Sequence, residues 1–103
     1  MQESFHKIKQ TVQSFLPDAQ VLLFGSKAKG TANPSSDFDV LVITKHNYSP
    51  PQKIKFNNLI HKALVAALKS PVDLIMHSEE EVKVYQNYFG HIVRYAVKEG
   101  IML

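Results

Sequence analysis

Residues 21–43, VLLFGSKAKGTANPSSDFDVLVI, contain two apolar runs joined by a polar segment. The first run stops at Gly25-Ser26, and the second begins directly behind Asp37-Phe38-Asp39. Short apolar runs that are bounded by Gly, Pro, Ser and Asn predict strands. The segment between them predicts a short helix that begins at Ser26, followed by a loop over residues 31–36. Two carboxylates therefore stand at the mouth of a strand that otherwise reads as buried.

The remainder of the chain extends this pattern to the order α-β-α-β-α-β-α. Apolar residues at helical spacing predict helices over residues 3–16, 51–69 and 79–98, the last of them bent or broken at Gly90. The strands are expected over residues 20–24, 37–44 and 72–76. Ser49 before Pro50, and Ser78 three residues before Glu81, are helix start signals. We expect one α+β domain over residues 1–103, a two-layer structure in which helices pack on a small mixed sheet of three to four strands.

Composition narrows the classes of protein that fit. The chain has 103 residues, of which 45% are hydrophobic, and no cysteine, so disulfides and cysteine-based zinc sites are excluded. The N-terminus lacks the apolar core of a signal peptide, and no apolar run approaches the roughly 20 residues that cross a bilayer. These features predict a cytoplasmic protein without membrane contact. The net charge of +3 comes from scattered lysines without a basic run, which disfavours direct nucleic-acid binding.

The aspartates are the strongest chemical signal. Asp37 and Asp39 lie two residues apart on a strand, so both side chains point to one face. Side by side they repel each other unless a cation holds them, and Mg²⁺ favours one or two such carboxylates together with phosphate oxygens. A pair of solvated aspartates at a strand end is the alternative. Asp73 opens the third apolar strand and joins the pair if that strand runs parallel to the second.

Gly25-Ser26 reaches the same rim if the first strand is antiparallel to the second. Glycine permits a tight turn and a close backbone approach to a ligand. Ser26 could cap the short helix that follows, whose N–H groups would then bind phosphate, with Lys27 and Lys29 adding positive charge. An ordinary strand-to-helix turn is the alternative.

Together these residues resemble the DNA polymerase beta-type nucleotidyltransferase superfamily, and most of all its minimal nucleotidyltransferases. The matching signature is Gly-Ser…Gly…Ser-Asp-x-Asp, carried here by Gly25, Ser26, Gly30, Ser36, Asp37 and Asp39. Asp73, in Pro-Val-Asp-Leu-Ile, matches the third carboxylate of the family. Two residues depart from the pattern. Lys29 replaces the common Arg, which loses bidentate phosphate binding, and Phe38 replaces Ile or Leu.

The resemblance implies a polymerase beta-like fold and a transferase that moves a nucleoside monophosphate, expected to be AMP from ATP, to a hydroxyl. It implies a pair of Mg²⁺ ions, with Mn²⁺ as an alternative, bound by the catalytic residues Asp37, Asp39 and Asp73. Asp73 would bind the ion that activates the acceptor. The phosphates would be held by Gly25, Ser26, Lys27, Lys29, Gly30 and Ser36.

The resemblance also implies a partner, because minimal nucleotidyltransferases are often antitoxins that adenylylate a tyrosine of a HEPN-type toxin. A small-molecule transferase of the aminoglycoside-modifying type, with a dimer supplying the acceptor surface, and a non-catalytic antitoxin or binding module are the alternatives. The nucleotide, the acceptor and the oligomeric state stay open.

The histidines and aromatic residues are assigned no catalytic role from the sequence. The five histidines lack paired metal spacing, although His77 follows the third strand closely enough to approach the site. Tyr85, Tyr88, Phe89 and Tyr95 are expected in the core or at a partner interface, and an exposed aromatic stripe would favour the interface.

Overall fold

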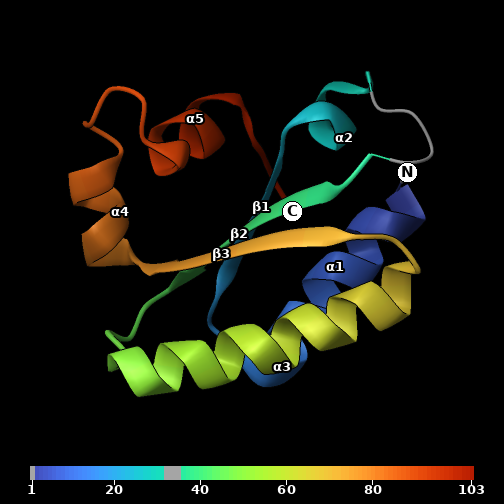
Figure 1. Cartoon of the computed structure of the whole chain (residues 1–103), viewed down its shortest axis with the longest axis horizontal. Coiled ribbons are helices and arrows are strands. Elements are labelled where there is room, and N and C mark those ends of the chain that lie inside the picture. The colour runs from blue at the N-terminus through green and yellow to red at the C-terminus, as the bar shows by residue number, and fades with distance from the viewer. Residues whose placement is uncertain (1, 32–35) are drawn as a thin grey trace.

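The fold is a four-stranded sheet with helices on both faces, seen in a computed structural model that describes residues 2–31 and 36–103 (Figure 1). The strands are β1 (Gln20–Phe24), β2 (Phe38–Thr44), β3 (Val72–Ser78) and β4 (Ile101–Met102). The helices are α1 (Gln2–Phe15), α2 (Ser26–Lys29), α3 (Pro50–Leu68), α4 (Glu79–Tyr85) and α5 (Ile92–Glu99). Within the described residues, no helix is long and apolar enough to cross a membrane.

The sheet has the mixed topology on which the grouping of the aspartates depends. Its strand order is β3-β2-β1-β4, with β1 antiparallel to both β2 and β4, and β2 parallel to β3. The parallel pair is joined through α3, as a crossover between parallel strands requires. The start of β2, the start of β3 and the end of β1 therefore meet at one edge of the sheet.

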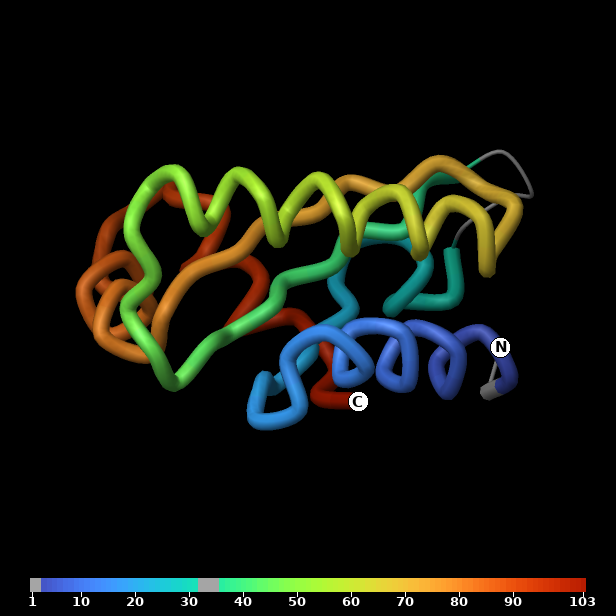
Figure 2. Tube along the Cα trace, turned by 90° about the horizontal axis from the view of Figure 1, so that it is seen from below, coloured from blue at the N-terminus to red at the C-terminus, as the bar shows by residue number. Residues whose placement is uncertain are grey.

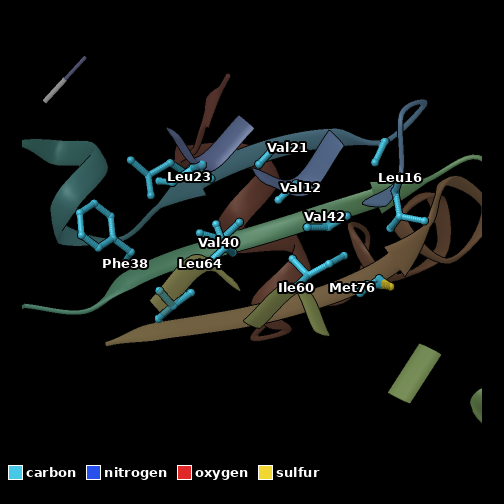
Figure 3. Close-up of a cluster of buried hydrophobic side chains, with 13 residues drawn as sticks. Val12, Leu16, Val21, Leu23, Phe38, Val40, Val42, Ile60, Leu64 and Met76 are labelled. Atoms are coloured by element: carbon cyan, nitrogen blue, oxygen red, sulfur yellow. The ribbon is translucent and has the colours of Figure 1, made fainter. Parts of the chain in front are cut away.

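One face of the sheet is covered by α1 and α3, which run in opposite directions across it (Figure 2). Alternate strand residues, among them Leu23, Phe38, Val40 and Val42, pack there against Ile60 and other buried residues of the two helices (Figure 3). The other face carries a smaller core, in which Phe24, Leu41 and Ile43 pack against Val82 of α4 and against Val93 and Ala96 of α5. The α+β class with a mixed sheet is confirmed, and the second helical face is an addition to the two layers expected.

The C-terminal region differs most from the sequence prediction. The helix expected to run to Phe89 ends at Tyr85, and α5 begins only at Ile92. The segment that connects α4 to α5 ends at His91. The His91 Nδ1 accepts a hydrogen bond from the Val93 N–H at 3.1 Å and so caps the start of α5. Strand β4 was not predicted, since two residues give no periodicity. It forms because the chain turns back at Gly100 and pairs with β1.

Capping boxes fix the starts of α3 and α4, as the sequence signals predicted. The Ser49 hydroxyl accepts from the Gln52 N–H, and the Ser78 hydroxyl accepts from the Glu81 N–H at 3.1 Å. Glu81 also receives the Lys53 ammonium at 3.0 Å, which ties α3 to α4 at the C-terminal end of β3. Burial acts to raise the pKa of Glu81, but the Ser78 N–H and Lys53 outweigh it and hold that pKa below its ordinary value.

Candidate active site

Strand register brings the three predicted carboxylates to one rim of the sheet. Asp39 of β2 is directly opposite Asp73 in the parallel pair and opposite Phe24 in the antiparallel pair. Asp37 precedes β2 by one residue and shares the parity of Asp39, so it lies toward the same face. This is the face that carries α4 and α5. Asp39 is half-buried, whereas Asp37 and Asp73 are exposed.

The pKa of Asp39 reflects its burial and the nearby charges of the other two aspartates. Burial raises the pKa of its carboxyl, and the charges of Asp73 and then Asp37 raise it further. Across the described ranges 2–31 and 36–103, no three acidic or histidine side chains converge tightly enough to enclose a metal ion as they stand. The rim is thus a cluster of mutually repelling oxygen donors, two of which are exposed and keep rotamer freedom.

Gly25 brings the main chain against this cluster. Its φ of 76° and ψ of −159° lie in a region that is almost exclusive to glycine. A Cβ atom at this position would overlap the Asp39 carboxylate oxygen Oδ2. The main chain therefore turns tightly at Gly25, as the sequence predicted, and the group that it approaches closely is the Asp39 carboxylate.

Ser26 lies at the start of α2 but does not cap it. Gly25 is the N-cap residue and makes no side-chain hydrogen bond there, while Ser26 is the first helical residue. The predicted capping role of Ser26 is wrong because the main chain turns one residue earlier, at the glycine. The Gly25 carbonyl accepts from the Ala28 N–H at 3.1 Å, and Gly30 ends the helix at a φ of 74°.

The two lysines of α2 point to different faces of the sheet. The Lys29 ammonium lies 5.4 Å from the ring centroid of Tyr95 on α5, on the carboxylate side. The Lys27 ammonium lies 4.6 Å from the ring centroid of Phe38, which belongs to the opposite core (Figure 3). Sequence reasoning gave both lysines the same role, and only their contacts separate them.

Ser36 completes the set of predicted site residues. It is half-buried and directly precedes Asp37. Most of the loop expected over residues 31–36 lies outside the described residues.

Comparison with models of known protein families identifies the family of this chain. The model of the nucleotidyltransferase domain matches residues 6–103 of the chain. The chain belongs to this family. The comparison with curated protein sequences gave no match.

Solved structures place the nucleotidyltransferase in the polymerase beta-like fold. A chain of a toxin–antitoxin crystal structure with AMP-PNP is 24% identical with a TM-score of 0.65, and the alignment covers 94% of this chain and 69% of that one. A chain from the complex of tri-AMPylated Shewanella oneidensis HEPN toxin with MNT antitoxin is 20% identical with a TM-score of 0.63, over 98% and 69% of the two chains. A candidate minimal nucleotidyltransferase is 22% identical with a TM-score of 0.65, over 98% and 94%. The resemblance to minimal nucleotidyltransferases is confirmed at the level of fold.

Two aromatic residues beside the site of the nucleotidyltransferase were not assigned there from sequence. Tyr95 packs edge-on against Phe24, with ring centroids 5.9 Å apart, and Phe24 is the register partner of Asp39. The sequence carried a signal for Tyr95 only in its helical spacing with Tyr88 and Phe89, and this spacing does not reveal the neighbour on β1.

His77 lies away from the three aspartates of the rim. It is opposite Ile43, four residues along β3 from Asp73, and its ring packs edge-on against Tyr85 at 5.1 Å between centroids. Burial lowers the pKa of His77 against the opposing effect of the Glu81 carboxylate. His77 is thus part of the α4 packing, in line with the structural role expected of the histidines.

Proposed function

We propose that this nucleotidyltransferase moves AMP from ATP to a hydroxyl group. The observation that carries the proposal is the register of Asp39 with Asp73, with Gly25 placed so that only a hydrogen atom faces the Asp39 carboxylate. A half-buried carboxylate beside two others raises the free energy of the folded chain unless a cation compensates the charges. Three carboxylates beside a glycine turn are typical of a site that binds a metal–nucleotide complex.

The chemistry of the donor atoms on the rim suits a divalent metal. The donors on the rim are carboxylate oxygens from Asp37, Asp39 and Asp73, which are the ligands that Mg²⁺ prefers and that Mn²⁺ also accepts. Asp39 would be the central ligand because its charge interacts with both of the other two. Bound metal ions supply charge neutralisation for the attacking and leaving oxygens.

The chain's own residues supply positioning and a proton acceptor. The main chain at Gly25-Ser26, Lys29 and Gly30 lies at the end of β1 and would hold the phosphates beside the rim, with Ser36 flanking Asp37. The acceptor oxygen forms a bond to the α-phosphorus as the bond to the β-phosphate oxygen breaks and pyrophosphate leaves. The exposed Asp73 carboxylate takes the proton of the acceptor hydroxyl.

For the acceptor, we infer a tyrosine of a HEPN-type toxin, with this protein as its antitoxin. The structural relatives support the inference, since one includes a tri-AMPylated HEPN toxin together with an MNT antitoxin and another is a toxin–antitoxin structure with AMP-PNP. The first description names an AMP-modified toxin and the second an analogue of ATP, and both fit a transferase whose acceptor is the toxin.

The test is a mass measurement on a defined mixture. The purified chain is incubated with ATP, Mg²⁺ and a purified HEPN-type protein, and intact masses are recorded. The expected result is a gain of one or more AMP units on the HEPN-type protein, mapped to tyrosine and abolished by EDTA. Transfer to an aminoglycoside or spectinomycin instead would favour the small-molecule reading, and failure to bind labelled ATP with Mg²⁺ would favour a non-catalytic module.

The different contacts of Lys27 and Lys29 give a second prediction. Lys29→Ala is expected to raise the KM for Mg²⁺–ATP by about 10-fold, because a charge-assisted contact to phosphate contributes about 1.5–3 kcal/mol. Lys27→Ala, the matched control on the same helix, is expected to change KM less than about 2-fold, since its ammonium lies on Phe38 at the other core. Steady-state kinetics with ATP as the varied substrate measure both. Equal effects of the two substitutions would contradict the assignment.

A further inference from the structure

A second surface of the molecule carries apolar side chains that the catalytic proposal does not use. The connection from α4 to α5 exposes Tyr88 and Phe89, with 90% of Phe89 accessible, and α5 adds Ile92 and Tyr95. We name the α5 surface the set formed by the exposed Phe89, Ile92, Tyr95 and Lys98 together with the half-buried Arg94. Large apolar side chains that gather on one surface mark interaction sites more often than chance.

Phe89 is held in its exposed position by neighbouring groups. The Arg94 guanidinium lies over its ring, 4.5 Å from the centroid. Arg94 is itself fixed, because its Nη1 donates to the Gln86 carbonyl at 3.1 Å. An aromatic ring stacked on an anchored arginine is the kind of preorganised group that dominates binding energy at protein interfaces.

A hollow of about 410 Å³ lies on the same surface, lined by Gly90, His91, Ile92, Arg94, Tyr95, Lys98 and Glu99. Its charged groups are mostly basic: Arg94 and Lys98 stand against the single carboxylate of Glu99. Lys29 adds a further positive charge where the surface ends at Tyr95. The chemistry of the hollow therefore fits an apolar side chain flanked by acidic groups.

The α5 surface is continuous with the candidate active site through Tyr95. Tyr95 lines the hollow, and its ring also contacts the Phe24 ring and the Lys29 ammonium. Phe24 in turn pairs with Asp39. A molecule seated on this surface would thus lie beside the rim of carboxylates, and its own hydroxyl groups would be within reach of the transferred nucleotide.

We propose that the α5 surface docks the protein that receives the nucleotide, by an apolar patch edged with aspartate or glutamate. This inference rests on the proposed function, since it names the surface that presents the acceptor. A second copy of this chain fits less well, because a two-fold contact would set the same basic groups against each other. An acidic partner turns that repulsion into attraction.

The experiment measures binding and transfer separately, with the HEPN-type protein as the probe. Phe89→Ser is expected to raise the calorimetric Kd by about 30-fold or more, as for a buried aromatic anchor. Arg94→Glu is expected to weaken binding and to make it much less dependent on salt. Ile54→Ser on α3 is the matched control, because Ile54 is 62% exposed and lies under the opposite face, and it should leave Kd unchanged. Phe89→Ser should also raise KM for the partner with little change in kcat.

Asp39→Asn separates the two proposals, since it is expected to bind the partner like the original chain and to lower transfer by about 1000-fold. If Phe89→Ser and Arg94→Glu bind as tightly as the original chain while Asp39→Asn lowers transfer to that extent, the docking inference is overturned and the transferase stands. If the original chain does not bind the HEPN-type protein, the docking inference is likewise overturned. Binding of ATP with Mg²⁺ then remains the separate test of the catalytic site. Sedimentation of the chain alone is the remaining check, and a dimer that Phe89→Ser dissociates would reassign the surface to self-association.

Discussion

Asp39→Asn is expected to lower nucleotide transfer by about 1000-fold, the rate equivalent of several kcal/mol of lost metal-dependent stabilisation. The substitution keeps the shape of the side chain and removes one charge at the centre of the cluster. Asp39 is the residue to change because it faces Asp73 across the parallel pair and lies against Gly25. Transfer is measured by the mass gain of the acceptor under single-turnover conditions, which isolates the chemical step from release of product.

The same variant carries a stability readout that a merely structural aspartate would not give. Burial and the charges of Asp73 and Asp37 raise the pKa of Asp39, so ionising Asp39 at neutral pH costs folding free energy. Without divalent ions, Asp39→Asn is therefore expected to raise the Tm by a few degrees. Added Mg²⁺ is expected to raise the Tm of the original chain and to leave that of the variant nearly unchanged. Asp18→Asn, in an exposed turn before β1, is the control for both measurements. An active variant, or one that is less stable than the original chain without metal, would contradict the assignment of Asp39.

Much of this site follows from the sequence because it depends on strand direction. Asp37 and Asp39 share a face by the two-residue repeat, and Asp73 joins them once β3 is taken as parallel to β2. Long helices with clear start signals, such as α3, give a parallel crossover and so fix that direction. These elements were predictable because their residues repeat with a period or occupy fixed cap positions.

The remainder depends on contacts between segments far apart in the chain. Lys27 and Lys29 are equivalent in sequence, and their different rings, Phe38 and Tyr95, come from the two cores on opposite faces of the sheet. The break after Tyr85 depends on a histidine cap and on the Arg94 contact to Gln86, neither of which has a strong sequence signal. The α5 surface could be anticipated as a set of aromatic spacings, but its exposure and its link to β1 required the fold.

Gly25→Ala is expected to lower the free energy of unfolding by about 3 kcal/mol and transfer by about 100-fold. Two effects add in the folded state: a backbone conformation that side chains rarely adopt, and the overlap of the new methyl group with Asp39 Oδ2. Because the methyl group pushes the central carboxylate, misplacement by even about 1 Å accounts for the loss of transfer. Urea denaturation measures the first effect, and the acceptor mass gain measures the second.

Gly30→Ala measures the cost of a positive φ without a steric overlap. Gly30 has a φ of 74° and a ψ of 13°, the left-handed helical conformation, and a Cβ there meets none of the described residues within 4 Å, so the expected cost is only about 1 kcal/mol. A double-mutant cycle then isolates the contact. In the background of Asp39→Ala, which removes the carboxylate, Gly25→Ala should cost clearly less than about 3 kcal/mol, because only the strain of its backbone conformation remains. A cost near 3 kcal/mol in both backgrounds would show that Gly25 serves the turn alone, whereas a smaller cost without Asp39 means that the glycine is required because the carboxylate occupies the space of its side chain.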